Sequence, residues 1–243
     1  MKTGKLFGIG VGPGDPGLIT VKATRILARS HHVFVPRAKT KTESLAYAIA
    51  GRYLGKKARV HELVFPMTKI REELKRYWAQ NGRNVADVLK TGEDAVFLTL
   101  GDPFLYSTYS YLLRELKQLI PGVKVVSVPG ITSFSLAAAL TDFPIGEGDG
   151  PVTVMPVTMS GNALIMETFK RKGTVVLMKI DKRLPEIIDL MEEAGVIDDA
   201  VMVSHAGMKG ERIETDLRKL KKVGAEAGYF SVILIHVSER KKQ

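Results

Sequence analysis

The chain has 243 residues and a formal net charge of +10 at pH 7, and 45% of its residues are hydrophobic. A chain of this length can form one large domain or two small ones, each with its own core. It contains no cysteine, which excludes disulfide bonds and thiolate metal sites and fits a reducing cytoplasm. Apolar runs fall short of the roughly 18 residues of a membrane span, and the start does not resemble a signal peptide.

The positive charge allows three kinds of partner: nucleic acid, an acidic membrane surface, or a small polyanionic substrate. Lysines and arginines are scattered along the chain, and clusters such as Lys219 to Lys222 have no aromatic residues between them. A groove for single-stranded nucleic acid combines basic and aromatic side chains. The pattern therefore disfavours nucleic acid, is typical of a solvated surface, and leaves a polyanionic substrate open.

Apolar runs alternate with segments of helical periodicity through the first part of the chain. Thr20 is placed to cap a helix, and the polar-rich stretch 69–90 predicts a long helix with an interruption near Asn81 and Gly82. Strands are predicted over residues 5–11, 32–36, 58–65, 95–100 and 123–128, and helices over 21–29, 43–52, 69–90, 111–119 and 133–140.

The connection 143–151 is rich in glycine and proline and predicts a domain boundary. Strands that alternate with helices on both sides of it predict the α/β fold class in two domains. The N-terminal α/β domain is expected over residues 1–145 and the C-terminal α/β domain over 151–243. After the boundary, strands are predicted over 152–157, 174–179, 200–204 and 229–237, and helices over 163–170 and 184–193.

The run Ala95–Leu100 is apolar without polar alternation, which is typical of a strand covered on both faces. It breaks at Gly101-Asp102-Pro103 and leads into a helix, so a carboxylate follows the end of a strand. Ligands of open α/β sheets bind at that end, and residues 101–109 are therefore predicted to form the floor of an active site. Asp102 has two interpretations: a cap for the next helix, or a side chain that points into the cleft.

Two further strand-to-helix junctions are rich in glycine and proline. Residues 12–17 match G-x-G-x-x-G, but two prolines remove amide donors and no acidic residue follows at the spacing that binds a ribose. A dinucleotide site is therefore disfavoured, and this loop is either a plain turn or the wall of a ligand cleft. Residues 129–133 form the other junction, where Thr132 or Ser133 can cap the next helix. Neither metal-spaced histidines nor a Ser-His-Asp pattern occurs, so we expect no protein-bound metal and no acyl-transfer nucleophile.

Three stretches, in this order and spacing, resemble the signatures of the tetrapyrrole methylases: Gly10-Val-Gly-Pro-Gly-Asp-Pro-Gly-Leu-Ile-Thr20, Leu100-Gly-Asp-Pro-Phe104 and Val128-Pro-Gly-Ile-Thr-Ser133. Residues 175–178 and 229–231 also match, so the resemblance covers the whole chain. It implies a homodimer of two unequal α/β domains, with S-adenosyl-L-methionine folded into the cleft between them. The implied cofactor contacts are Pro13, Gly101, Asp102, Leu105, Thr132, Ser133, Met178 and Ala206.

Within the family, details resemble the enzymes that methylate C-20 of precorrin-2 or cobalt-factor II in cobalamin biosynthesis. These details are Phe34-Val-Pro-Arg37 with Lys39, Phe65-Pro-Met67, and Tyr106-Ser-Thr-Tyr-Ser-Tyr111. A tetrapyrrole substrate carries acetate and propionate carboxylates, which a basic run after the second strand would attract and orient. A plain basic surface loop is the alternative interpretation. The substrate-binding residues we expect are Arg37, Lys39, Tyr106 and Tyr109.

One departure from the family concerns the catalytic base. The uroporphyrinogen III methylases carry an aspartate, proposed as a base, after the second strand, whereas Val35-Pro36-Arg37 contains no acid. This argues against uroporphyrinogen III as substrate and leaves the base unassigned. Methyl transfer from a sulfonium is an in-line displacement, so alignment and exclusion of water are the main demands.

Several alternatives remain open. Within the family they are a C-11 or C-17 precorrin methylase and diphthine synthase, which acts on a protein. From other classes they are a basic nucleic-acid-binding protein and a cofactor-binding regulator without turnover. We expect a cytoplasmic enzyme that has neither a nucleic-acid nor a membrane partner.

Overall fold

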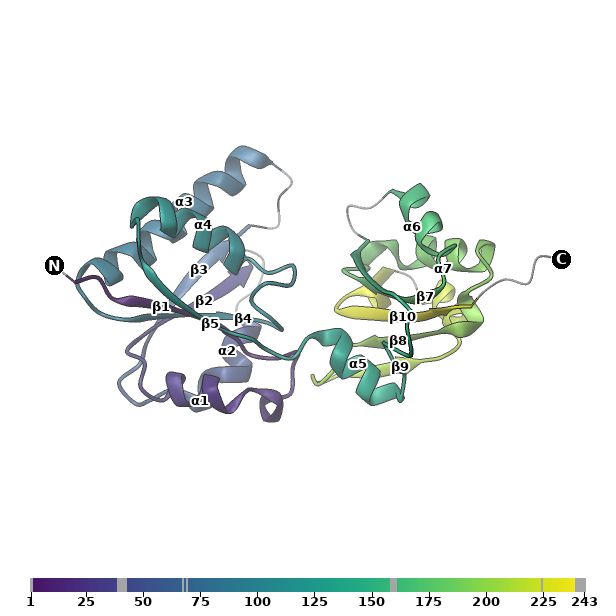
Figure 1. The fold of residues 1–243 in the computed structure, drawn as a ribbon, viewed down its shortest axis with the longest axis horizontal. Coiled ribbons are helices and arrows are strands. Elements are labelled where there is room, and N and C mark those ends of the chain that lie inside the picture. The colour runs from purple at the N-terminus through teal and green to yellow at the C-terminus, as the bar shows by residue number, and fades with distance from the viewer. Residues whose placement is uncertain are drawn as a thin grey trace. The chain divides into compact units, whose positions relative to one another are not determined.

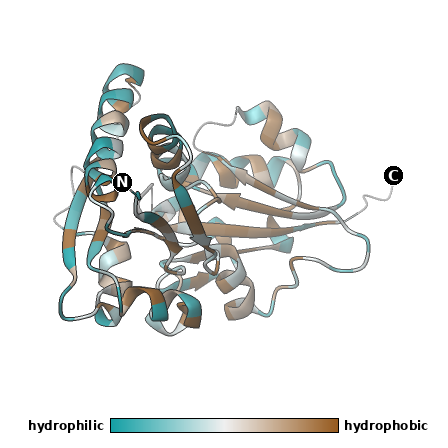
Figure 2. Cartoon of the chain, turned by 60° about the vertical axis from the view of Figure 1, so that its left-hand side comes forward, coloured by the Kyte–Doolittle hydropathy of each residue, from teal (hydrophilic) through white to brown (hydrophobic). Residues whose placement is uncertain are grey.

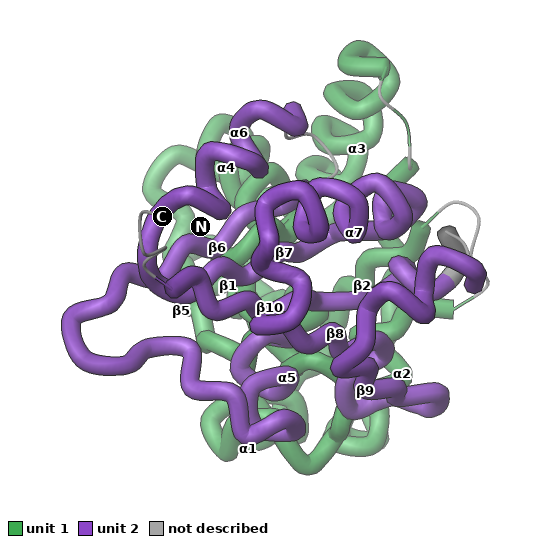
Figure 3. Tube along the Cα trace, turned by 90° about the vertical axis from the view of Figure 1, so that its right-hand side faces the viewer, with its two compact units in different colours: residues 1–132 green, residues 133–243 purple. Residues whose placement is uncertain are grey.

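A computed structural model describes residues 2–38, 43–66, 68, 70–157, 161–223 and 225–238. The chain divides into two compact units, Met1–Thr132 and Ser133–Gln243 (Figure 3). This division differs from the boundary expected at 143–151 because helix α5 (Ser133–Thr141) packs on strands β8 (Ala200–Ser204) and β10 (Ser231–Val237) of the second unit. Among the described residues, every helix is too short or too polar to cross a lipid bilayer.

The first unit is a five-stranded parallel sheet with helices on both faces (Figure 1). The strand order is β3-β2-β4-β1-β5, and every pairing is parallel. Helices α1 and α2 cover one face, and α3 and α4 cover the other. The strands are β1 (Lys5–Gly10), β2 (His32–Ala38), β3 (Arg59–Phe65), β4 (Ala95–Thr99) and β5 (Lys124–Val128). The helices are α1 (Val21–Leu27), α2 (Leu45–Ala50), α3 (Arg71–Lys90) and α4 (Tyr109–Leu119).

Two apolar cores, one on each face of this sheet, explain the continuous hydrophobic runs of its strands. Strand β4 is buried along its whole length, with Phe97 on the face of α3 and α4 and Leu98 on the face of α1 and α2. The strands of both sheets are mostly hydrophobic, while the helices alternate between hydrophobic and hydrophilic residues (Figure 2). The prediction of a strand covered on both faces at 95–100 is therefore confirmed.

Local sequence signals set the helix ends and the course of α3. Thr20 caps α1 as predicted, because its Oγ1 accepts a hydrogen bond from the amide of Ala23 at 3.2 Å. The interruption expected near Asn81 and Gly82 does not occur. The Asn81 side chain is buried and donates to the carbonyl of Val64 at 2.9 Å. Gly82 lets α4 approach closely, since a Cβ there would lie 2.9 Å from Glu115 Cβ.

The second unit is built on a mixed five-stranded sheet of order β6-β7-β10-β8-β9. Only β6 and β7 are parallel; the other neighbours are antiparallel. Helix α5 covers one face and helices α6 and α7 cover the other. The three-residue strand β9 was missed because it is short and mostly exposed. The remaining elements are β6 (Val152–Pro156), β7 (Gly173–Met178), β9 (Arg212–Glu214), α6 (Asn162–Thr168) and α7 (Leu184–Glu193).

Candidate functional site

The centre of the first sheet has the geometry that binds ligands in open α/β folds. Strands β1 and β4 are neighbours, yet the chain leaves β1 for helix α1 on one face and leaves β4 for helix α4 on the other. Open α/β sheets bind ligands beyond the carboxyl ends of the strands at such a switch point, and we refer to this end of β1 and β4 as the crevice. The two loops join there, because the Gly101 amide donates to the Gly12 carbonyl at 2.8 Å.

Three glycines, one from each sequence motif, meet at this crevice. A Cβ on Gly10 would lie 2.5 Å from the Gly101 oxygen and 2.7 Å from the Gly130 nitrogen. A Cβ on Gly130 would lie 2.2 Å from the same Gly101 oxygen. All of these atoms belong to the backbone, so no flexible side chain can yield. Gly10 and Gly130 therefore pack closely against the backbone of Gly101, and this contact joins the three motifs at one end of the sheet.

Asp102 ties the second motif to the third. Its Oδ1 accepts from the Phe104 amide at 2.9 Å, and its Oδ2 accepts from the Gly130 amide at 3.1 Å. Helix α4 begins at Tyr109, after Thr108, so the interpretation of Asp102 as the cap of that helix is wrong. The carboxylate instead closes a local turn and fixes the spacing between two loops of the crevice.

The loop after β4 presents aromatic and apolar side chains. Phe104 is 61% exposed and Tyr106 is 40% exposed, and Leu105 between them is half-buried. Tyr106 adopts a positive φ of 51°, which is uncommon for a residue with a side chain. Pro13, on the loop after β1, is buried. The loop after β4 therefore has the composition expected for contact with a large apolar ring. The substrate role of Tyr106 stays a prediction.

Tyr109 lies beneath this loop and is fully buried. Its hydroxyl hydrogen-bonds to Ser127 Oγ at 2.9 Å, and its ring occupies the space that a Cβ on Gly8 would need. Burial raises the pKa of the Tyr109 hydroxyl, and the hydrogen bond to Ser127 lowers it by a smaller amount. The structure therefore gives Tyr109 a part in packing the crevice floor, and direct contact with substrate stays a prediction.

The expected basic substrate contacts are only partly described. Arg37 lies near the end of β2, where its Nε is 2.7 Å from Glu62 Oε2 and its side chain is 23% exposed. Lys39 lies outside the described residues. Arg37 thus stands at the correct edge of the sheet but is already paired with a carboxylate.

In the second unit, the structure brings Met178 and Ala206 together. Met178 ends β7 and Ala206 follows β8, and both pack in the apolar cluster on the face that α5 covers. Ser133 begins α5, and Thr132 is the last residue of the first unit. Met178 and Ala206 therefore share one apolar cluster in the second unit. Their cofactor roles stay predictions.

Sequence reasoning missed a set of residues beside Met178 and Ala206. Lys179, Asp181, His205 and Phe230 all have positive φ angles, between 46° and 55°. Such angles favour glycine, asparagine, aspartate and histidine, so Lys179 and Phe230 have no residue type that would signal them. Only the backbone geometry identifies them.

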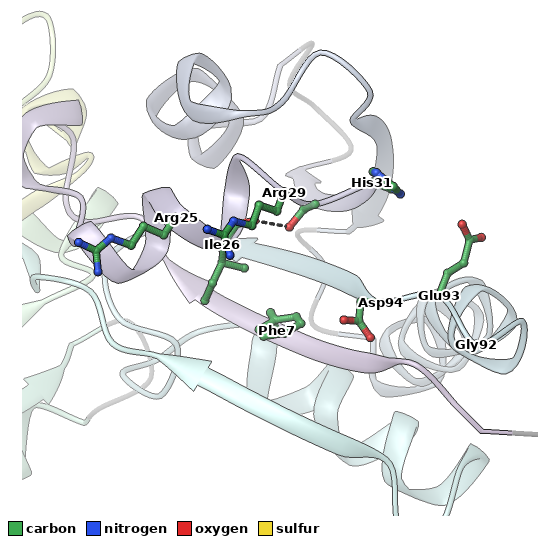
Figure 4. A pocket seen from close by; sticks show the side chains of 9 residues that line it. Phe7, Arg25, Ile26, Arg29, His31, Gly92, Glu93 and Asp94 are labelled. Carbon is green, nitrogen blue, oxygen red and sulfur yellow. Dashed lines mark hydrogen bonds between the residues drawn. The ribbon is translucent and has the colours of Figure 1, made fainter.

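A cavity of about 550 Å³ lies elsewhere in the first unit (Figure 4). Its lining comes from α1, from residues before β2 and β4, and from Phe7 of β1, so it opens near the amino ends of the strands. Asp94 at its rim accepts from the Lys5 amide at 2.7 Å. The three glycine motifs do not contribute to it. In the part of the chain that the structure describes, no group of three histidine, aspartate or glutamate side chains could hold a metal ion.

Comparison with known proteins gives a consistent result. Residues 5–221 match the family described as Tetrapyrrole (Corrin/Porphyrin) Methylases. The chain is 36% identical over 209 residues to a probable cobalt-precorrin-2 C(20)-methyltransferase of Methanocaldococcus jannaschii, which covers 82% of this chain and 86% of that relative. It is 32% identical over 233 residues to the cobalt-precorrin-2 C(20)-methyltransferase of Salmonella typhimurium, which covers 96% of each chain.

A solved structure extends the likeness to the fold. The uroporphyrin-III C-methyl transferase of Thermus thermophilus, complexed with S-adenyl homocysteine, superposes with a TM-score of 0.63. The two chains are 21% identical, and the match covers 96% of this chain and 97% of the other. At that identity the comparison shows a shared fold.

Proposed function

Because the chain belongs to the tetrapyrrole methylases, we propose that it transfers a methyl group from S-adenosyl-L-methionine to C-20 of precorrin-2 or its cobalt form, in cobalamin biosynthesis. The observation that carries the proposal is the meeting of Gly10, Gly101 and Gly130 at the switch point of the first sheet. It supports the proposal because the three family signatures come together at one end of the sheet in this chain. The two relatives, at 32% and 36% identity over most of the chain, supply the position of methylation.

The crevice suits S-adenosyl-L-methionine because its wall is backbone rather than side chain. Gly10 and Gly130 pack against the Gly101 carbonyl, and the Asp102 carboxylate holds the second and third loops together. When bound, the cofactor supplies a methyl group on a positively charged sulfur. The protein's share of the reaction is alignment: fixed loops can hold the methyl group and the accepting carbon in line and exclude water. We extend the proposal to Met178 and Ala206 as contacts for the same cofactor.

The carboxylates of the proposed substrate are complementary to the positive net charge of the chain. The acetate and propionate groups of the macrocycle pair with arginine in a fork of two hydrogen bonds. Arg37 is held near the end of β2 by Glu62, so a substrate carboxylate must compete with that ion pair. We propose Arg37 and Lys39 as orienting residues, and Phe104 and Tyr106 as the apolar side of the same contact.

The test is an anaerobic incubation with precorrin-2 and with its cobalt form, in which S-adenosylhomocysteine release and the mass of the pigment are followed. We expect one methyl group per macrocycle, located on C-20 by NMR. Later intermediates that accept methyl groups at C-11 or C-17, and a diphthamide precursor protein, serve as competing substrates. Turnover of one of these, with neither C-20 substrate accepted, would refute the assignment.

We also propose that the enzyme works as a cytoplasmic homodimer. Its family resemblance supports the dimer, and the absence of cysteine fits a reducing compartment. Light scattering coupled to size exclusion would give twice the 26.7 kDa of one chain. A monomer mass across the working concentration range would contradict the dimer, and recovery of the native protein in a membrane fraction would contradict the location.

A further inference from the structure

The loop after β4 contains a residue in a sterically unfavourable conformation. Tyr106 has a φ of 51°, in the left-handed region where the Cβ of an L-residue crowds its own backbone. Such conformations persist only where the surrounding structure fixes them, and they are frequent at ligand-binding sites. Contacts on either side of Tyr106 must therefore hold this part of the loop in place.

A buried pair of hydroxyl groups lies at the end of the loop. Ser107 directly follows Tyr106, and Thr99 is the last residue of β4; both side chains are buried. Ser107 Oγ and Thr99 Oγ1 are 2.7 Å apart, and the Tyr109 amide donates to Ser107 Oγ at 3.1 Å. Ser107 therefore connects the end of strand β4 to the first residue of helix α4. We call Thr99 and Ser107 the hydroxyl pair.

The start of the loop is fixed by different hydrogen bonds. The Asp102 carboxylate accepts from the amides of Phe104 and Gly130. The segment 102–107 is thus held at its start by a carboxylate and at its end by the hydroxyl pair. A short segment held at both ends has few backbone conformations to choose from, which explains how the left-handed Tyr106 persists.

The exposed ring of Phe104 rests on a buried aromatic base. It meets the Tyr109 ring edge to face, with centroids 5.5 Å apart, and Tyr109 stacks in turn on Phe97 of β4 at 5.9 Å. The Tyr109 hydroxyl is bonded to Ser127 of β5. Phe104 therefore contacts the core of the first unit on one side, while more than half of its surface stays open to a ligand.

A conjugated macrocycle is a ligand that suits the two exposed rings of this loop. Aromatic side chains attract other π systems through stacked or edge-to-face contacts. A ring on a mobile loop must be ordered when the ligand binds, whereas a ring on a fixed loop avoids most of that entropy cost. The hydroxyl pair can therefore affect ligand binding although both hydroxyl groups are buried.

We propose that Ser107 is a positioning residue for the tetrapyrrole, an inference that rests on the proposed function. Through Thr99 and the Tyr109 amide it fixes the loop, so that Phe104 and Tyr106 present their rings to the macrocycle in one arrangement. Ser107 itself takes no part in methyl transfer. The alternative is a serine that only caps the first turn of α4, with an effect on stability alone.

The test measures binding of each C-20 substrate to Ser107→Ala, under anaerobic conditions and with S-adenosylhomocysteine present to prevent turnover. The dissociation constant, followed by the pigment's absorption band, should rise about tenfold, because two aromatic side chains must again be ordered on binding. The dissociation constant for S-adenosyl-L-methionine, measured by calorimetry without pigment, should change by less than about threefold, since Asp102 still fixes the start of the loop.

Ser30→Ala is the matched control. Ser30 is a half-buried serine of the same unit whose hydroxyl donates to the Ile26 carbonyl at 2.8 Å, and it lies near the amino ends of the strands. Its replacement should lower stability by a similar amount, as Trp78 fluorescence in urea would show, and leave pigment binding unchanged. Weaker pigment binding in Ser30→Ala of the same size as in Ser107→Ala would overturn the inference.

Thr99→Val and the double variant test the hydroxyl pair. If the two hydroxyl groups act together, Thr99→Val should also weaken pigment binding, and the two effects should not add in the double variant. Should Ser107→Ala fail to fold, Thr99→Val provides the same comparison. Unchanged pigment binding in both single variants, or fully additive effects, would leave Ser107 as a helix cap. If the wild-type protein neither binds the pigment nor releases S-adenosylhomocysteine with either C-20 substrate, the proposed function has failed instead.

Discussion

Gly10→Ala tests whether the meeting of the three glycine motifs is the basis of the site. The added Cβ would lie 2.5 Å from the Gly101 oxygen and 2.7 Å from the Gly130 nitrogen. Ordinary contact begins at 3.4 Å, so the Gly101 oxygen must retreat by about 0.9 Å. Both atoms belong to backbone that is tied down, Gly101 to Gly12 and Gly130 to Asp102. Relief therefore requires movement of whole loops.

The size of the effect follows from that geometry. Inserting a methyl group into a packed site costs about 1–3 kcal/mol, and rigid backbone on two sides favours the upper end of that range. With a urea m-value of about 2 kcal/mol/M, a loss of about 3 kcal/mol lowers the unfolding midpoint by about 1.5 M. A shift of the catalytic loops by about 1 Å should also lower kcat/KM roughly 100-fold.

The assay uses the only tryptophan of the chain, Trp78, which lies on α3 of the first unit and stacks on Tyr111. Its fluorescence during urea unfolding therefore reports on the unit that holds the glycines. Gly17→Ala is the matched control, since its nearest contact is the flexible Asp15 carboxylate at 3.2 Å, and its midpoint should move by less than about 0.3 M. An unchanged midpoint and unchanged kcat/KM in Gly10→Ala would show that the motifs do not constrain one another as described.

Three further predictions concern the first unit. Tyr109→Phe should cost about 1 kcal/mol of stability at pH 8, because it removes the hydrogen bond to Ser127. The pKa of Tyr109 is raised, so the neutral hydroxyl contributes fully to stability below pH 10.0, and this contribution is lost as the pH rises further. The free energy of unfolding, followed by Trp78 fluorescence, should therefore fall more steeply in alkali for the wild type than for this variant. A parallel decline in the two proteins would contradict this. Burial, followed by the charges of His32 and Arg59, lowers the pKa of His61, so its contribution to stability should be complete above pH 6.5 and be lost as the pH falls below it. His61→Gln should therefore reduce the loss of unfolding free energy at acid pH. An unchanged loss in this variant would exclude His61 as its source. Arg37→Ala should raise KM for the tetrapyrrole far more than the dissociation constant of S-adenosyl-L-methionine, and equal effects in the two titrations would argue against a substrate contact.

The sequence by itself determined which segments become strands and which loops carry the site. The run 95–100 lacks polar residues because β4 is covered on both faces, and that burial is a property of a few consecutive residues. The cap at Thr20 was readable for the same reason, since it depends on atoms three residues apart. The three glycine motifs identified the family without any knowledge of how they meet.

Only the tertiary structure decided which distant segments lie together. Helix α5 follows the third motif directly, yet it belongs to the second unit because its apolar face packs on β8 and β10. The hydrogen bond from the Gly130 amide to the Asp102 carboxylate links residues 28 positions apart. The left-handed turn at Lys179 has no local sequence signal. Local periodicity indicates which residues are buried. Strand order and register, in contrast, arise from pairing between segments far apart in the chain, and no short stretch specifies its partner.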